Sequence, residues 1–485
     1  MRASAEPLTA NVGAASVPVP ATALPCAGCH GRDGLGRPEG GVRPTNITWQ
    51  NLAKQYGGTT ELGRRWQGYD EDSFLRAVSA GIDSAGNKLD SSMPRYNISR
   101  RDARDLIAYL KVIQDDFDPG VSAEAIVIGT IQPSGGFQAR TGESMLEVMR
   151  ASFAEVNREG GIFGRELRLE VAIYDDRQSL IARANRMIGD EEVFALANVF
   201  SSSADESVSR LVESGEIPSI APYTQFPVAD DSGRQYTFYL HGGLAAQIES
   251  LIRHAATRDP SASAFVFYRR DGGFGGIAEH ARELFAKHGF ADVESVAYAD
   301  RSPQALRELV ALDSPVQPVL LFVGSSAELV SLVGADAPAG RTPRLLLPGY
   351  FVSGDVVKLP TAYAESLEMS YVTVPDSGAG RQLSGFREFM RRNGLQANNL
   401  NTRLYAYAAT ELLLEGIKRA GKRVTRKKLL DEIEKLYAFD VGLNRPLTFG
   451  SRHRVGLLVQ QEPAEQLHHS ALRDLHQQIG QLHQR

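Results

Sequence analysis

The sequence predicts a multidomain protein in which a small helical domain is followed by a larger α/β domain with parallel sheets. Amphipathic helices dominate the chain up to about residue 117, whereas short apolar strands alternate with helices from residue 125 onward. The length of 485 residues allows two or three domains with separate cores. With 42% hydrophobic and 23% charged residues, the composition is ordinary for a globular protein.

The stretch "CAGCH" contains both cysteines of the chain and the first histidine. A disulfide between cysteines this close would restrict little chain, and zinc would lack further ligands because the next histidine is His241. A thioredoxin-like pair would need a preceding strand, which "VPVPATALP" does not supply. The spacing therefore predicts one covalently attached haem c, with Cys26 and Cys29 as thioether anchors and His30 as an axial iron ligand.

Met93 is predicted to be the second axial ligand of the haem iron. It is the one methionine between Met1 and Met145, and it lies in the polar, proline-containing loop "SSMPRYNIS". A thioether is a soft ligand that raises the reduction potential of cytochromes. The alternative is a methionine that fills a gap in the core, for which such a loop is a poor place.

Two helices are predicted in the N-terminal region from their apolar spacing. The stretch "SRRDARDLIAYLKVI" begins with Ser99 as N-cap, and "DEDSFLRAVSAGID" ends near Gly81. Three aromatic residues could line a haem crevice or simply pack in the core: Trp49, Trp66 and Tyr69. Among several arginines, Arg95 is the candidate for contact with a haem propionate.

Residues 21–117 resemble the monohaem cytochrome c family. The resemblance rests on "CAGCHGRDG", the loop "MPRY" and the closing helix. It implies a small all-α cytochrome c domain with an electron-transfer role. It also implies a periplasmic location, because the family receives its haem outside the cytoplasm. A signal peptide is not visible in this chain, and residues 1–20 are predicted to form an N-terminal tail.

Residues 118–124, "DPGVSAE", are predicted to be a linker because they are polar and carry a Pro-Gly pair. The run "AIVIGTIQPSGG" then predicts a buried strand, followed by the helix "ESMLEVMRASFAEVNREGG" and the strand "LRLEVAIYDD". The alternation continues through "FALANVF", "IPSIAPY", "SAFVFYRR", "ESVAYAD", "PVLLFVG" and "PRLLLPGY". This rhythm predicts α/β architecture with parallel sheets.

Residues 125–456 resemble periplasmic binding proteins of the branched-chain amino acid receptor type. The resemblance rests on Asn157, Gly160-Gly161-Ile162, Gly164-Arg165 and Asp175-Asp176, and on "NTRLYAYAATELLLEGIKRAGK" and "LNRPLTFGSRHRVG". It implies a two-lobed type I periplasmic binding protein fold with a ligand in the cleft. The first lobe is expected to take residues 125–240 and 375–440, and the second lobe the rest. Residues 457–485 depart from the family and are predicted to form an atypical C-terminal helix.

The run "NVFSSSADES" places three serines between a strand and a helix, where free N–H groups and hydroxyls can bind an anion. Serine N-caps occur at such positions in any α/β protein, so capping alone would also explain them. The resemblance implies a ligand carboxylate here and a cleft lined from both lobes. The candidate lining residues are Phe137, Ser201, Ser202, Ser203, Ala221, Tyr223, Thr224, Phe274, Ser325 and Tyr350.

Tyr350 stands where amino-acid binders of this family carry an acid for the ligand ammonium. A buried ammonium without a paired acid would be costly. We therefore expect a small carboxylate without an α-amine, such as an aromatic or branched-chain acid.

The chain has no second CxxCH, GxSxG elbow, P-loop or HExxH motif, so we expect no enzyme. Its net charge of -5 gives no reason to expect nucleic acid. The expected function is a periplasmic electron carrier joined to a solute-binding module, with a dehydrogenase or another cytochrome as redox partner. The alternatives are the receptor of an ABC importer and its permease with a cytochrome tether, a haem enzyme with an open iron position, or a redox-linked ligand sensor.

Overall fold

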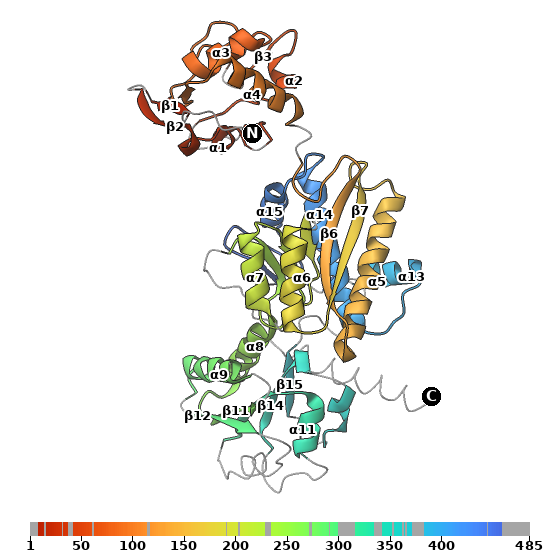
Figure 1. Cartoon of the computed structure of the whole chain (residues 1–485). Helices are drawn as coiled ribbons and strands as arrows, with labels where there is room; N and C mark the ends of the chain where they lie inside the picture. Colours follow the sequence, from red (N-terminus) through yellow and green to blue (C-terminus); the bar gives the residue numbers. More distant parts are fainter. Residues whose placement is uncertain are drawn as a thin grey trace. The chain divides into compact units, whose positions relative to one another are not determined.

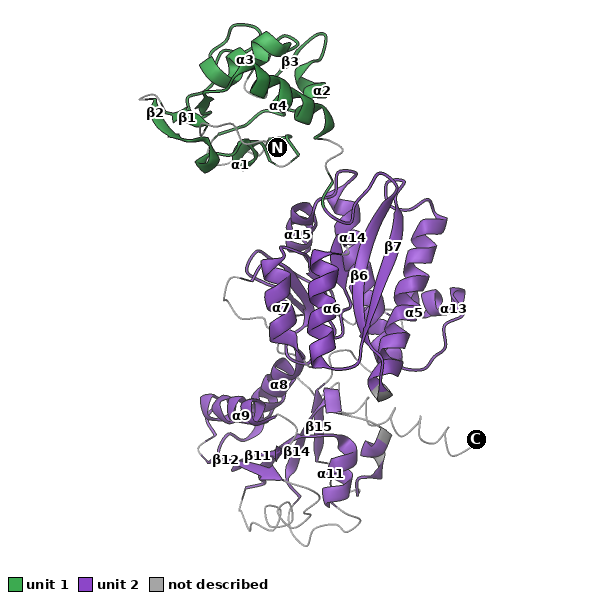
Figure 2. Cartoon of the chain, viewed as in Figure 1, with its two compact units in different colours: residues 1–118 green, residues 119–485 purple. Residues whose placement is uncertain are grey.

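The chain folds into two compact units, residues 1–118 and 119–485 (Figure 2). The computed structural model describes residues 8–13, 16–31, 33–36, 42–60, 63–113, 117–190, 192–201, 204–227, 234–270, 274–290, 292–298, 316–333, 342–351, 354–360, 363, 366–370, 383–443 and 445–457. None of the helices within these ranges is long and apolar enough to cross a membrane.

Unit 1 is built mainly from short helices around a small apolar core. Their bounds are α1 (Cys26–His30), α2 (Trp49–Leu52), α3 (Glu71–Ala80) and α4 (Arg100–Val112). Capping boxes begin α3 at Asp70 and α4 at Ser99, which confirms the predicted N-cap, and Gly81 ends α3 in the left-handed conformation. The described core comprises Leu52, Phe74, Val78, Ala103, Ile107, Leu110 and Ile113.

The structure differs from the predicted N-terminal tail at residues 9–20. Strands β1 (Thr9–Val12) and β2 (Val17–Pro20) form an antiparallel hairpin, and β1 also pairs with β5 (Arg95–Tyr96). Ala10 is buried opposite Tyr96. A second short pair joins β3 (Gly58–Thr59) to β4 (Arg65–Trp66). Residues 9–20 are therefore part of unit 1 and are held by backbone pairing. Their proline-containing sequence did not predict this pairing.

The first lobe of unit 2 contains a six-stranded parallel sheet in the order β16-β10-β9-β8-β6-β7. Its strands are β6 (Ala125–Pro133), β7 (Glu166–Tyr174), β8 (Ala195–Ala197), β9 (Ser219–Ile220), β10 (Thr237–His241) and β16 (Val455–Leu457). Its helices are α5 (Gly136–Arg158), α6 (Arg177–Gly189), α7 (Asp205–Ser214), α13 (Ser384–Arg392), α14 (Leu400–Ala420) and α15 (Arg426–Glu434). Helix α14 packs against α5 and α15, and α6 packs against α7 (Figure 1).

The second lobe contains a five-stranded parallel sheet in the order β12-β11-β13-β14-β15. Its strands are β11 (Ala264–Arg269), β12 (Val293–Tyr298), β13 (Val319–Val323), β14 (Arg344–Pro348) and β15 (Leu367–Ser370). Helices α8 (Gly243–Arg258), α9 (Gly275–Lys287) and α11 (Ser326–Val333) accompany this sheet, together with the 3₁₀ turns η3 (Gly349–Phe351) and η4 (Gly354–Lys358). The predicted architecture, a small helical domain followed by a two-lobed α/β domain with parallel sheets, is confirmed.

The division between the lobes differs from the prediction near the C-terminal end. Residues 441–456 were expected in the second lobe, but β16 pairs with β10 in the first sheet. Leu447, Phe449 and Leu457 belong to the first lobe's core. The prediction differed because it did not foresee that the last strand, β16, pairs with β10 at the edge of the first sheet. The predicted C-terminal helix lies outside the described residues, apart from Leu457.

Candidate functional site

The cysteine motif forms the helix α1 of unit 1. Cys26 and Cys29 are exposed, free thiols three positions apart, so they lie on the same side of this short helix. Gly31 follows with a φ of 75°, a conformation that glycine adopts without strain and that ends the helix. Two accessible thiols on one face are suitable anchors for the thioether bonds of a haem.

His30 is oriented by the backbone of a distant loop. Its Nδ1 donates a hydrogen bond to the carbonyl oxygen of Thr45 at 2.8 Å. Because the carbonyl can only accept, the proton is on Nδ1 and Nε2 is left unprotonated for a metal. Burial lowers the pKa of the imidazole, although the bond to Thr45 opposes this shift. His30 is thus held in the neutral form that iron coordination requires.

The loop that carries Met93 is fixed by Arg95. The Arg95 guanidinium donates hydrogen bonds to the carbonyl oxygens of Met93, Leu89 and Asp90. The described bonds of Arg95 therefore go to this loop, a role that the sequence analysis missed when it considered a propionate contact. The position of Arg95, two residues after Met93 in a polar loop, was the sequence feature that could have predicted bonds to the loop backbone.

Tyr96 connects the end of this loop to the cysteine motif. Its hydroxyl donates to the carbonyl oxygen of Leu24 at 2.6 Å. Burial raises the pKa of Tyr96, and the neighbouring Cys26 and Cys29 raise it further. The strand that follows Met93 therefore lies beside the two cysteines, although their separation in sequence is large.

The three aromatic candidates for the haem crevice differ in their surroundings. Trp49 packs edge-on against Phe74, with ring centroids 5.8 Å apart, and Tyr69 lies against the same core. The indole Nε1 of Trp66 is buried and has no hydrogen-bond partner among the described residues. A buried donor of this kind normally has a polar partner. The two exposed thiols on one side of α1 and the oriented imidazole of His30 are the residues that fit a covalently bound haem.

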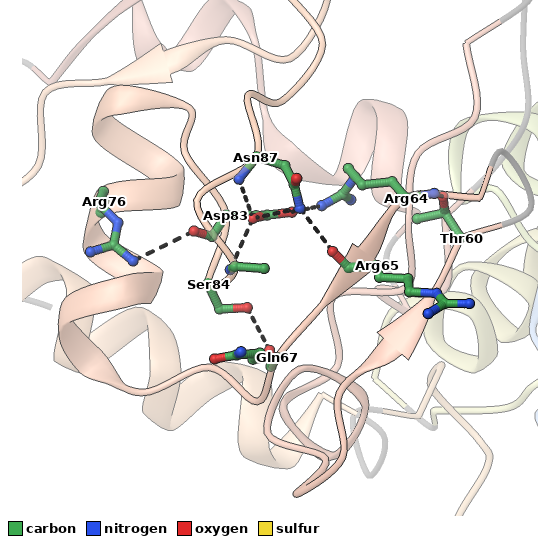
Figure 3. Close-up of polar contacts among 9 residues, drawn as sticks. Thr60, Arg64, Arg65, Gln67, Arg76, Asp83, Ser84 and Asn87 are labelled. Carbon is green, nitrogen blue, oxygen red and sulfur yellow. Dashed lines mark hydrogen bonds and ion pairs between the residues drawn. The ribbon is translucent and has the colours of Figure 1, made fainter.

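A buried carboxylate anchors the hairpin that carries Trp66 (Figure 3). The side chain of Asp83 is fully buried and pairs with the Arg64 guanidinium. Asn87 donates to Asp83 and, through the same amide, to the carbonyl oxygen of Arg65 at 2.8 Å. Burial opposes ionisation of Asp83, but the bonds from Asn87 and Arg64 outweigh it and hold the pKa below its usual range. The network therefore fixes the residue before Trp66 to the turn after α3.

The predicted serine run of unit 2 is described only in part. Ser201 is buried, and its hydroxyl donates to the carboxylate of Asp205, the first residue of α7. Ser202 and Ser203 lie outside the described residues. Phe137 is in the first turn of α5, but its side chain is outside the described part of the chain.

The predicted residues between β9 and β10 lie beside Ser201. Tyr223 bonds through its carbonyl oxygen to the N–H of Ser201 at 3.2 Å, and its ring contacts Phe200 and Tyr405, each with centroids 5.0 Å apart. Ala221 is buried with a φ of 49°, a strained conformation for alanine. The hydroxyl of Thr224 is within hydrogen-bond reach of Asp205. Ser201, Tyr223 and Thr224 are thus neighbours in the structure, and their role in ligand binding stays a prediction.

The candidates from the second lobe are divided between two places. Tyr350 reaches the first-lobe segment between β9 and β10, because the Gln225 amide bonds to its hydroxyl. Burial raises the pKa of Tyr350, with a contribution from nearby Tyr223. The Phe274 and Tyr350 rings both pack edge-on against Phe351, at 5.5 Å and 5.3 Å. The three rings therefore form one contiguous cluster, which Tyr350 connects to Gln225 of the first lobe.

Ser325 is engaged within its own element. Its hydroxyl donates to the carboxylate of Glu328 at 2.9 Å, and its N–H donates to the same oxygen. These bonds cap the start of α11, and no described contact joins Ser325 to the other candidates. Its role in the cleft stays a prediction.

Asp205 is the residue that sequence reasoning missed. Burial raises its pKa to about 6, although the bonds from Ser201 and Thr224 oppose this shift. Its charge also contributes to the raised pKa values of Tyr174 and Tyr405. In the sequence it follows the serine run with Ala204 between them, and the sequence analysis assigned it no role.

His241, at the end of β10, contacts the aromatic group formed by Phe200, Tyr223 and Tyr405. Its ring lies edge-on against Tyr405, with centroids 5.5 Å apart, and its Nδ1 accepts the N–H of Gly243 at 3.0 Å. Burial lowers the pKa of His241 to about 4. The imidazole is therefore neutral, and its proton is on Nε2.

Comparison with known families matches both units. A periplasmic binding protein model matches residues 125–457, and a cytochrome c model matches residues 21–114. An amino acid binding protein of Pseudomonas aeruginosa is 23% identical over 316 residues, which is 62% of this chain and 81% of the relative.

Solved structures share the fold of unit 2. An extracellular ligand-binding receptor from Verminephrobacter eiseniae has a TM-score of 0.54 and 18% identity, covering 69% of this chain and 95% of that one. A fatty acid ABC transporter substrate-binding protein from Thermomonospora curvata has a TM-score of 0.53 and 18% identity, covering 69% and 87%. At these identities the likeness concerns the fold alone.

Proposed function

This chain belongs to the periplasmic binding protein family and carries a cytochrome c domain before its binding domain, and we propose that it couples an electron carrier to a receptor for a small organic acid. The haem, when bound, supplies a one-electron redox centre. Cys26 and Cys29 would anchor it, and His30 and Met93 would serve as axial ligands. Both families are typical of the periplasm, where we place the protein.

The orientation of His30 is the observation that carries the electron-transfer role. The Thr45 carbonyl holds the proton on Nδ1, so Nε2 is available as a ligand beside two exposed thiols. With Met93 as the opposite ligand the iron would have no open position, which favours electron transfer over catalysis.

A Met93→Ala variant tests this assignment. Loss of the thioether should lower the reduction potential and allow cyanide to bind the iron, measured by spectroelectrochemistry and by titration of the visible spectrum. Ser92→Ala, an exposed neighbour in the same loop, is the matched control and should change neither. An unchanged potential and spectrum in Met93→Ala would exclude Met93 as a ligand.

The proposed ligand is a carboxylate without an α-amine. Tyr350 replaces the acid that amino-acid binders use, and its hydroxyl is bonded to Gln225. The aromatic side chains of Tyr223, Phe274 and Tyr350 suit a flat or apolar body. The T. curvata protein is named for fatty acids, which are carboxylates of this kind, whereas the P. aeruginosa relative is named for amino acids.

Calorimetry on the full-length holoprotein distinguishes these ligand classes. Benzoate or 4-methyl-2-oxopentanoate should bind saturably and raise the melting temperature of unit 2, whereas leucine should not. Tyr350→Glu should shift the preference toward leucine. Tight binding of leucine with both acids inert would restore the amino-acid ligand.

The second candidate is the receptor of an ABC importer with the cytochrome as a tether. The transporter-associated name of the T. curvata protein favours it. Repeating the melting experiment with oxidised and reduced haem separates the two candidates. Ligand affinity that depends on the redox state supports coupling, and equal affinity supports a tether.

A further inference from the structure

Asp205 is an acidic group inside the candidate ligand site, and no described cation pairs with it. Its carboxyl accepts hydrogen bonds from Ser201, which precedes α7, and from Thr224, in the segment between β9 and β10. The adjacent Glu206 differs in both respects. It is exposed, and it forms an ion pair with Arg234 at 3.0 Å. Two acids in one helical turn therefore have opposite environments.

The ionisable groups that face Asp205 from other elements are neutral. Tyr174 at the end of β7 and Tyr405 on α14 both respond to its charge, and burial raises the pKa of each. Tyr223 is likewise a tyrosine with a raised pKa. His241, which contacts Tyr405, is uncharged because burial lowers its pKa to about 4.

Two charged groups of α6 and its N-cap, on the helix that packs against α7, are bonded to their own neighbours. Asp176 caps its own helix by accepting the N–H of Ser179 at 2.7 Å. Arg183 donates to the carbonyl oxygen of Ile173 at 3.2 Å. The pKa of Asp205 is set by burial, which raises it, and by the bonds from the Ser201 and Thr224 hydroxyls, which lower it; no cation is among these causes. Burial without a cation favours the protonated carboxyl, in keeping with its pKa of about 6.

A ligand carboxylate next to Ser201 would share this site with Asp205. Two carboxylates in contact strongly disfavour double ionisation, so one proton is kept between them. Hydroxyl donation from Ser201 and Thr224 leaves room for the Asp205 carboxyl to act as a donor in turn.

We propose that Asp205 is a specificity-determining residue that takes up one proton from solvent when the ligand carboxylate binds, and donates its O–H to that carboxylate. The proton returns to solvent when the ligand leaves, so no co-reactant is consumed. The inference rests on the proposed function, because it requires a carboxylate ligand. It explains how a cleft with an internal acid accepts an anion, and it makes the affinity decrease as pH rises.

Proton uptake measured by calorimetry tests the proposal. The full-length holoprotein is titrated with benzoate and 4-methyl-2-oxopentanoate between pH 5 and 8, in two buffers with different ionisation enthalpies. At pH 8 we expect uptake of about one proton, and a Kd that rises about tenfold per pH unit above pH 6. Asp205→Asn keeps the size and can still donate, so it should bind without proton uptake and without this pH dependence.

Glu206→Gln is the matched control, because it removes the same charge from the same helical turn. It should retain the proton uptake of the wild type. Binding of either acid by the wild type without proton uptake, or uptake that persists in Asp205→Asn, would overturn the role of Asp205 and leave the proposed function standing. Binding of leucine that is lost in Asp205→Asn would assign the acid to a ligand ammonium instead. If none of the three probes binds, the proposed ligand class itself falls.

Discussion

The two units differ in what completes their cores. The described core of unit 1 is one small cluster from α2, α3, α4 and their flanks. The first lobe of unit 2 instead buries a six-stranded sheet under helices, with Phe194, Phe238 and Met149 fully enclosed. Small domains bury too little apolar surface to be stable without additional cross-links or cofactors.

From this comparison we expect the haem to contribute to the stability of unit 1 when it is bound, whereas the larger cores of unit 2 are formed by its own side chains. The haem motif supplies the covalent attachment that a small core needs. Unit 2 can accommodate the acid Asp205 and the neutral imidazole of His241 because its large apolar cores stabilise the fold elsewhere.

The largest expected effect comes from removing haem attachment with Cys26→Ala and Cys29→Ala together. Unit 1 should lose its cooperative fold, because the haem would otherwise fill the space beside its core. Unit 2 should keep its own melting transition and its ligand affinity, measured by calorimetry on the full chain. Loss of both transitions would show that the units depend on each other, and a unit 1 that melts as before would show that its core suffices without haem.

The next effect concerns the buried Asp83 of unit 1. Asp83→Asn leaves the Arg64 guanidinium without its carboxylate and should cost about 3 kcal/mol, as removal of one partner of a buried pair does. Denaturant unfolding followed in the haem absorption band measures this cost. Asp72→Asn removes the same charge from an exposed pair with Arg100, and should cost less than about 1 kcal/mol. Equal costs would mean that the haem, and not the Asp83 network, holds the hairpin of Trp66.

The haem site could be predicted because its chemistry is contiguous. Cys26, Cys29 and His30 occupy five positions, and their spacing alone indicates the cofactor. The cleft could be predicted only as a set of loops following strands. The environment of Asp205 depends on Thr224 and Tyr405, which are distant in sequence. They come close to Asp205 only after the strands and α14 have packed together.

The pairing of very short strands was the other feature that could not be predicted from the sequence. The strand β16 has three residues, and its sequence does not indicate whether it returns to the first or the second sheet. The hairpin of β1 and β2 contains prolines and few buried side chains, so its backbone pairing with β5 left no periodic pattern.

The smallest expected effect concerns His241 and the pH dependence of the stability of unit 2. His241 has a pKa of about 4 when folded and about 6.5 when unfolded, so the unfolded chain binds more protons between these values. Its contribution to stability is present above pH 6.5 and is lost as pH falls toward 4. His241→Gln removes this titration and should reduce the acid-induced loss of stability of unit 2 by about 2 kcal/mol.

The reason is local, because protonation of Nδ1 would break its bond from the Gly243 N–H. His280→Gln, an exposed histidine on α9, is the control and should follow the wild type. Urea unfolding of the full chain at pH 7, 5.5 and 4.5, followed in the second transition, measures the difference. A His241→Gln curve parallel to the wild type at all three pH values would mean that the imidazole is not held neutral. A charged imidazole would then be tolerated next to the ring of Tyr405. His241 would no longer count among the neutral groups around Asp205.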